Sequence, residues 1–214
     1  MRPLPPTLVC FAVKEEAAGF HRLAEWPPQI RTLVTGMGRG NAAKAVRAVL
    51  VGTLPGLVLT CGFAGGLRPG LAAGTVVFAA DPETSLESAL QAAGAQAARF
   101  HCVQQVVTTA RQKQALWEAT GADAVEMESH VIREICRERR VPSATVRIIL
   151  DAAEEDLPLD FNALMTPDQR LAPGRLARVL AGSPGKIGAL LRLRKQSRVA
   201  ADLLARVLRR VLVP

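Results

Sequence analysis

Short apolar runs alternate along this chain with stretches in which apolar residues recur at helical spacing. The apolar runs predict strands at residues 8–13, 30–35, 57–60, 76–79, 103–107, 122–125 and 144–150. The helical stretches predict helices at residues 15–23, 41–50, 86–97, 109–120 and 129–138. Strands that alternate with helices in this way predict a three-layer α/β fold, with a central mixed sheet flanked by helices.

The C-terminal part of the chain has a different character from the rest. We expect a main α/β domain at residues 1–165 and a helical tail at residues 166–214, with a proline-bearing hinge at residues 167–184. Leucine and valine recur at helical spacing between positions 203 and 211, with arginines between them. Two interpretations stay open: the tail packs on the body with a solvated basic face, or it contacts anionic lipid as an interfacial helix.

Charge is distributed unevenly along the 214 residues, which carry a net charge of +8. Residues 165–214 contain eleven basic and two acidic residues, which gives +9, so the remaining chain carries −1. A neutral body argues against nucleic acid as a partner, whereas the basic segment suits an anionic membrane or another acidic surface.

Cysteine and histidine do not form a recognisable metal-binding pattern. The four cysteines and three histidines lack ligand spacing, and Cys10 and Cys61 lie in apolar runs typical of buried thiols in a reducing compartment. The N-terminal apolar stretch is ended by Lys14 and the glutamates after it, too early for a signal peptide. We therefore expect a cytoplasmic protein, which would be peripheral at the inner membrane face if the tail contacts lipid.

Three carboxylates follow two of the predicted strands. Glu126 and Glu128 lie where residues 122–125 pass into a helical pattern, and Asp151 ends the run at 144–150. Because ligands bind beyond the carboxyl ends of strands in open α/β sheets, both segments place acids at one rim. Glu128 can accept two hydrogen bonds from vicinal hydroxyls, or it can simply cap a helix. Glu126 is expected to point elsewhere, because side chains alternate along an extended segment.

Asp151 has the sharpest chemical interpretation. A purine leaves a sugar slowly unless the base is protonated, and a carboxylic acid with a pKa raised by burial can supply the proton. Its apolar flanks favour such a shift, although a surface aspartate at the start of a loop is the alternative. Glu16, after the first strand, either begins a helix or activates a water molecule.

Two glycine-bearing turns follow strands. Gly36 and Gly38 lie in the first, and the second runs from Gly62 to Gly66. Glycine lets backbone N–H groups approach a ligand, but a tight strand-to-helix turn or close packing would use glycine equally well.

Five segments in this order resemble the purine nucleoside phosphorylase and nucleosidase superfamily, which includes methylthioadenosine/adenosylhomocysteine nucleosidases. They are Val13-Lys14-Glu15-Glu16, Gly36-Met37-Gly38, Gly62-Phe63-Ala64-Gly65-Gly66-Leu67, Val125-Glu126-Met127-Glu128-Ser129 and Arg147-Ile148-Ile149-Leu150-Asp151-Ala152-Ala153-Glu154. The resemblance implies that Asp151 protonates the purine and that Glu128 holds the ribose hydroxyls. It also implies that Met127 packs against ribose and base and that Glu16 activates water in hydrolytic members.

The remaining pocket is assigned from the same resemblance. Gly36, Gly38, Phe63, Ala64 and Gly65 are expected to shape the phosphate or water site and the sugar pocket, and Val106 and Val107 the base pocket. Phe63 stands where relatives often have serine or threonine, and no arginine precedes it. The choice between phosphorolysis and hydrolysis is therefore open.

Met127-Glu128-Ser129-His130 and the long Leu/Arg-rich tail are most similar to the hopanoid-associated phosphorylase branch. This resemblance implies phosphorolytic removal of adenine from adenosylhopane, a lipid-linked nucleoside, by a homo-oligomer without metal or organic cofactor and with phosphate as a possible co-substrate. The alternatives are a hydrolytic methylthioadenosine/adenosylhomocysteine-type nucleosidase and a non-catalytic nucleoside-binding protein.

Overall fold

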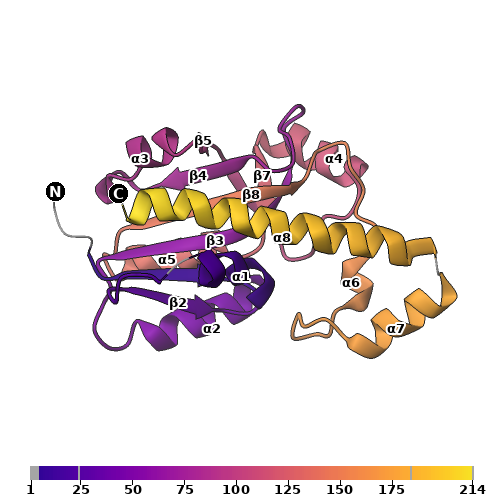
Figure 1. Cartoon of the computed structure of the whole chain (residues 1–214), viewed down its shortest axis with the longest axis horizontal. Coiled ribbons are helices and arrows are strands. Elements are labelled where there is room, and N and C mark those ends of the chain that lie inside the picture. Colours follow the sequence, from indigo (N-terminus) through magenta and orange to yellow (C-terminus); the bar gives the residue numbers. More distant parts are fainter. Residues whose placement is uncertain (1–4, 24, 184, 214) are drawn as a thin grey trace.

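A computed structural model describes residues 5–23, 25–183 and 185–213 of the chain. An eight-stranded mixed sheet lies at the centre of this part, between two layers of helices (Figure 1). The predicted three-layer α/β class is confirmed. Residues 1–4 of the predicted domain, Pro184 of the predicted hinge and Pro214 of the tail lie outside the described residues.

The sheet runs in the order β2-β1-β3-β8-β4-β5, and β7 joins β3 while β6 pairs with β7. The strands are β1 (Thr7–Phe11), β2 (Ile30–Val34), β3 (Leu57–Gly66), β4 (Val76–Ala80), β5 (Gln96–Ala97), β6 (Phe100–Cys102), β7 (Ala124–Glu126) and β8 (Ser143–Asp151). Strands β1, β2, β3 and β8 are parallel, whereas β4 is antiparallel to β8 and β7 to β3. The long parallel pair β3 and β8 therefore forms the middle of the sheet.

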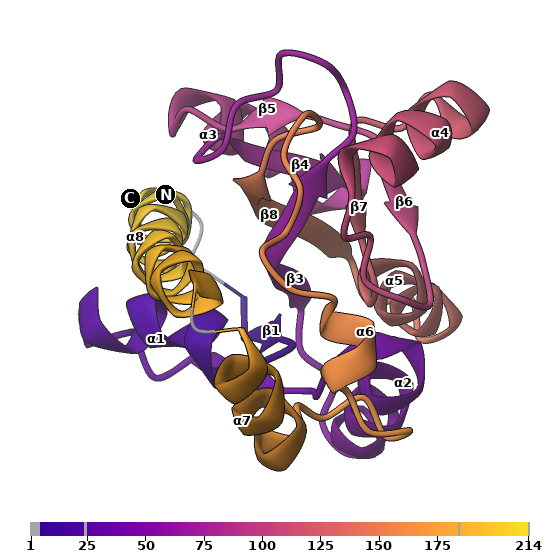
Figure 2. The ribbon, with the colours of Figure 1, turned by 90° about the vertical axis from the view of Figure 1, so that its right-hand side faces the viewer.

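Alternate side chains of the central strands enter two separate cores, as the period-2 pattern of a strand requires. Val9 and Phe11 pack beneath α1 (Lys14–Leu23), α3 (Glu87–Ala92) and α8 (Gly185–Leu212). Leu8 and Cys10 pack on the other side, against α2 (Gly38–Val49) and α5 (Ser129–Glu138). Figure 2 shows α1 and α8 on one side of β1 and β3, with α2 and α5 on the other.

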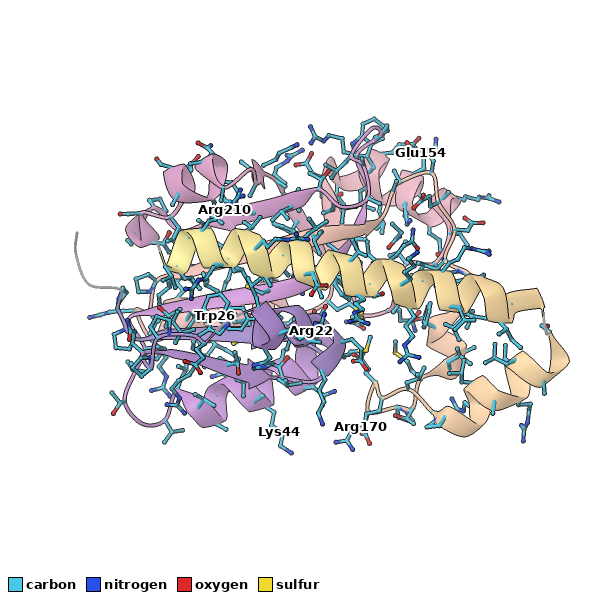
Figure 3. The ribbon with its side chains drawn as sticks, in the orientation of Figure 1. Arg22, Trp26, Lys44, Glu154, Arg170 and Arg210 are labelled. Atoms are coloured by element: carbon cyan, nitrogen blue, oxygen red, sulfur yellow. The ribbon has the colours of Figure 1, made fainter. Side chains whose placement is uncertain are left out.

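The C-terminal segment contains α6 (Phe161–Leu164), α7 (Pro173–Gly182) and the long α8. The C-terminal half of α8 contributes Leu204 and Leu208 to the core shared with α1, while no residue of α7 is buried. Arg22 of α1 pairs with Asp202 of α8 at 2.7 Å, and Arg209 lies over the Trp26 ring; Figure 3 shows Arg22 and Trp26 beside α8. The N-terminal half of α8 extends past the sheet toward α6 and α7 (Figure 1).

Two of the predicted elements are wrong and one interval holds more structure than expected. Residues 103–107 form no strand, and the strand in this region is β6. The Val106 amide instead donates to Asn162 Oδ1, and Asn162 Nδ2 donates to the Val106 carbonyl. The helix predicted at 86–97 is only α3, because Gly94 with φ +94° ends it before β5. The predicted hinge at 167–184 contains α7.

Candidate active site

The register between β3 and β8 sets the geometry of the site. Gly62 pairs with Arg147, and beyond a β-bulge at Ala64 and Gly65 the strand places Gly65 opposite Asp151. A Cβ atom on Gly62 would lie 2.4 Å from Glu16 Oε1 and 2.6 Å from Arg147 Nη1. Position 62 therefore needs glycine, because the ionic groups occupy the space that any side chain would need.

Arg147 is the centre of a buried ionic cluster. Its side chain is 2% exposed, and its guanidinium lies 2.6 Å from Glu126, 3.3 Å from Glu128 and 4.0 Å from Glu16. Burial opposes its charge, but the three carboxylates raise its pKa above the ordinary value. Arginine is thus fixed as a permanent cation among three acids.

Glu126 does not point away from the site, and the expectation that it would is wrong. Its Oε2 accepts hydrogen bonds from Arg147 Nη2 at 2.6 Å and from the Ser129 amide at 2.8 Å. Although burial favours the neutral acid, Arg147 and hydrogen bonds from Cys102 and Ser129 hold the pKa of Glu126 below its usual range. Glu126 points inward because the strand ends at this residue, so the chain turns into α5 before side-chain alternation can continue.

Glu128 is oriented from two sides. Its Oε1 accepts a 2.7 Å hydrogen bond from the Gly38 amide, and its Oε2 lies 3.3 Å from Arg147. Burial, with Glu126 and Glu16 nearby, raises its pKa to about 7 in spite of Arg147. The neighbouring Met127 is buried at 9% exposure. The structure thus holds Glu128 rigidly, as the binding of a diol would require.

Glu16 bridges the first strand to β3. Its Oε2 accepts from the Ala12 and Val13 amides at 2.8 and 3.3 Å, and its Oε1 accepts from the Phe63 amide at 2.8 Å. Burial raises the pKa of Glu16, while Arg147 and these amides oppose the rise. A carboxylate with a raised pKa is a better proton acceptor near neutral pH than an exposed one.

Asp151 ends β8 and is 9% exposed. It pairs with the ammonium group of Lys113, a fully buried residue of α4 (Ala110–Thr120). Burial raises the pKa of Asp151, and Lys113 partly offsets that rise. The carboxyl lies over Gly65, where a Cβ atom would come within 3.4 Å of Asp151 Oδ2.

The first glycine turn lies beneath the C-terminal segment. Gly36 and Gly38 have φ values of +85° and +79°, which explains why glycine is required at both positions. Gln169 is in contact with Gly38, and Asn41 Nδ2 donates to the Asp168 carbonyl at 2.9 Å. The segment before α7 therefore covers the turn that binds Glu128.

The residues predicted to line the base and sugar pockets lie in neighbouring elements. Phe63 and Ala64 belong to β3 beside Glu16, with Phe63 packed against the main core. Val107 packs near Val125. Val125 in turn lies beside Gly65, because a Cβ atom added to Gly65 would be 3.2 Å from Val125 Cγ1. Val106 and Val107 thus lie in the loop between β6 and α4, on the Asp151 side of the sheet.

Two residues of this site were missed from the sequence. Arg147 interrupts an apolar strand with a charge, a signal that could have marked it, because a charge in a central strand needs partners. Lys113 carries no such signal, since lysine is common on helix surfaces. Within the described ranges, no group of three or more His, Cys, Asp or Glu side chains is placed to hold a metal ion.

A sequence model of the Phosphorylase superfamily matches residues 79–181. The chain is 24% identical to the 5'-methylthioadenosine/S-adenosylhomocysteine nucleosidase of Shewanella sediminis, with 60% of this chain and 70% of the relative covered. These matches confirm the predicted resemblance to the nucleoside phosphorylase and nucleosidase superfamily and the predicted class, an enzyme that cleaves N-glycosidic bonds.

Solved structures of nucleosidase and futalosine hydrolase have the same fold. Futalosine hydrolase of Helicobacter pylori matches with a TM-score of 0.64 and 17% identity, over 94% of this chain and 96% of that one. The Neisseria meningitidis 5'-methylthioadenosine/S-adenosylhomocysteine nucleosidase in complex with methylthio-immucillin-A matches with a TM-score of 0.65 and 17% identity, over 94% and 97%. At these identities the likeness establishes the fold.

Proposed function

We propose that this protein hydrolyses the N-glycosidic bond of an adenine nucleoside. Two acidic sites near the carboxyl ends of β3 and β8 carry the proposal. Glu16 and Glu128 lie around Arg147 of β8, and Asp151 lies four residues further along β8. Glu128 binds the ribose hydroxyls, Asp151 protonates the leaving base, and Glu16 takes a proton from the attacking water. The two named nucleosidase relatives are consistent with this assignment.

The charge of the cluster favours water over phosphate as nucleophile. Three carboxylates surround one guanidinium, so the cluster has an excess of two negative charges when all groups are ionised. Protonation of Glu128, whose pKa is raised to about 7, or of Glu16, whose pKa is also raised, reduces this excess but leaves no net positive charge to bind an anion. A phosphate dianion would be repelled there, whereas a neutral water molecule would not.

The developing charge of the reaction fits the same groups. As the bond to the base breaks, the sugar gains positive character, and the buried carboxylates stabilise it at short range. The base gains negative charge and accepts the Asp151 proton at a ring nitrogen, after which adenine leaves as a neutral molecule.

The experiment measures adenine release from 5'-methylthioadenosine, S-adenosylhomocysteine and a 5'-alkyl adenosine, with and without phosphate. We expect release without phosphate, and loss of turnover with retained nucleoside binding in the D151N variant. Release that requires phosphate would establish phosphorolysis instead. Nucleoside binding without release from any substrate would indicate a binding protein.

For the finer identity of the substrate, we propose an adenine nucleoside with a large apolar 5' substituent, as adenosylhopane has. A cavity of about 860 Å³ lies between α1, the N-terminal half of α8 and the segment before α7. Leucines line it and basic residues border it: Leu171, Leu190, Leu191, Arg194, Lys195 and Arg198. The apolar lining is suited to an aliphatic group.

The same region supports contact with an anionic bilayer. Leu171, Ile187 and Leu191 are exposed by 46%, 44% and 59%, beside a run of exposed basic side chains on α8. Apolar side chains next to arginine and lysine are typical of interfacial segments. No helix in the described ranges is long and apolar enough to cross a membrane.

A liposome assay tests the membrane contact with matched triple variants. One variant, R192Q/R194Q/K195Q, neutralises exposed basic residues of α8. The control, R137Q/R139Q/K44Q, neutralises exposed basic residues at the C-terminal end of α5 and on α2. Only the α8 variant should lose binding to anionic vesicles, while both should release adenine from soluble nucleosides. Equal binding by the two variants would contradict the contact.

Assembly as a homo-oligomer stays a prediction, to be measured by light scattering.

A further inference from the structure

Lys113 is an unusual residue to find in the interior of this fold. Of the α4 residues, all of which the structure describes, Lys113 alone is buried, with 0% exposure. Burying an ammonium group is unfavourable unless partners replace its water, and an apolar residue would pack there without that cost. Retention of a charge at this position therefore needs a reason other than packing.

The ammonium group has a full set of partners, all in the segment that begins at Asp151. It donates to the Ala152 and Glu155 carbonyl oxygens, each at 2.7 Å, and pairs with Asp151 Oδ2. Two hydrogen bonds and one ion pair thus replace the water that the ammonium group loses on burial. Lys113 thus ties α4 to the end of β8.

Further hydrogen bonds fix this segment against the start of α4. The Ala152 amide donates to Glu155 Oε2 at 2.9 Å, and the Ala110 amide donates to Asp156 Oδ1 at 2.7 Å. These bonds hold the loop without any contribution from the Asp151 side chain. The contact between Lys113 and the Asp151 carboxyl is therefore additional to what the loop needs.

The two oxygens of Asp151 have different surroundings. Oδ2 is buried and forms an ion pair with Lys113 without accepting a hydrogen bond, and within the described ranges no hydrogen bond reaches Oδ1 either. The side chain keeps 12% exposure at the edge of the site. Lys113 thus holds Oδ2, and Oδ1 is left to contact a bound substrate.

We propose that Lys113 is a positioning residue for the acid of the reaction: its ammonium group holds Asp151 through Oδ2, so that Oδ1 carries the proton toward the leaving base. The inference rests on the nucleosidase reaction proposed above. Burial raises the pKa of Asp151 and Lys113 limits the rise, which keeps the carboxyl acidic enough to release its proton.

The charged groups that act on Asp151 are few. Lys113 comes from α4 and lowers its pKa, and Glu155 in its own loop raises it. Val125 of β7 and the β3 backbone at Gly65, which lie beside the carboxyl, are uncharged. A change at Lys113 should therefore appear directly in the titration of Asp151.

The experiment compares the pH dependence of kcat and KM for the wild type, K113M and the control K44M. Lys44 is an exposed lysine of α2 and projects from the body in Figure 3. Because Asp151 acts in its protonated form, activity falls as pH rises through its pKa. Loss of the Lys113 charge should move this alkaline limb upward by about one pH unit or more. It should also lower kcat about tenfold, with KM nearly unchanged.

Two further variants keep the test decisive if K113M folds poorly. K113Q removes the charge but retains donors for the carbonyls, and should shift the limb as K113M does. E155Q removes the opposing charge while its amide oxygen still accepts the Ala152 amide, and should shift the limb slightly downward. An alkaline limb at the wild-type position in a folded Lys113 variant would overturn the proposal.

NMR supplies a readout that does not depend on activity. The Asp151 carboxyl carbon, assigned by its loss in D151N, should titrate at higher pH in K113M or K113Q than in the wild type. In the wild type, the Lys113 ammonium nitrogen should respond to the same titration, and a silent Lys113 signal would contradict the pairing. If the wild type releases no adenine, the nucleosidase function fails while this titration still decides the role of Lys113.

Discussion

Arg147 donates a 2.6 Å hydrogen bond to Glu126 although the two side chains are only 2% and 1% exposed. A buried pair of this kind gives little net stability compared with apolar residues of similar size, because both ions lose their water. Here, however, the arginine also neutralises Glu16 and Glu128, so its removal would leave several buried carboxylates without a counterion.

We therefore predict that R147M lowers the free energy of unfolding by about 3–5 kcal/mol at neutral pH, with the loss reduced toward pH 5 as the carboxylates take up protons. Urea denaturation measures both effects. The control is R47M: Arg47 pairs with Glu138 at 3.1 Å with both side chains about half exposed, and should matter by less than about 1 kcal/mol. Equal losses in the two variants would contradict the role of Arg147 as shared counterion.

Glu128 should make the fold less stable as the pH rises. Its pKa is raised from 4.5 to about 7, so between these values the folded chain holds a proton that the unfolded chain has released. Stability is then lost as pH rises from about 4.5 to about 7, by at most about 3 kcal/mol. E128Q lacks this titration, and its stability relative to the wild type should increase over that range. A constant difference between the two would show that Glu128 is not titrating there.

Gly62 is predicted to tolerate no side chain. G62A places a methyl group against Glu16 and Arg147 and adopts φ +149°, so we expect a loss of about 2–4 kcal/mol together with loss of adenine release. G70A is the matched control, because Gly70 has φ +77° but no atom within 4 Å of the added carbon. It should cost about 1 kcal/mol and leave activity intact. Similar losses of stability in the two variants would mean that backbone strain, and not contact with the ionic cluster, accounts for the effect of G62A.

The C-terminal half of α8 should behave as part of the main core. Leu208 is fully buried in the cluster that contains Phe11 and Phe20, so L208A should cost about 2–5 kcal/mol in thermal or chemical unfolding. L191A, at a position that is 59% exposed on the same helix, should change stability by less than about 0.5 kcal/mol. A small effect of L208A would show that this half of the helix detaches without loss of the fold.

Motif order was sufficient to place the main acids of the site. Glu16, Glu128 and Asp151 follow strands, and the carboxyl ends of neighbouring parallel strands meet at one edge of a sheet. Elements with strong local patterns, such as α5 and β8, lie where they were predicted. The predicted direction of the Glu126 side chain was wrong, because the alternation of side chains between the two faces of a strand no longer applies where the strand ends.

The sequence by itself determined the α/β class, the positions of the strong helices and strands, and the acids that the superfamily motifs mark. Only the tertiary structure decided that Glu126 faces Arg147, that Lys113 is buried against Asp151, and that part of the basic tail belongs to the core. The physical reason is that charge pairing and burial depend on residues far apart in the chain. Arg147 of β8 pairs with Glu16 of α1, and Leu208 of α8 shares a core cluster with Phe20 of α1. No local pattern contains both partners of such a contact.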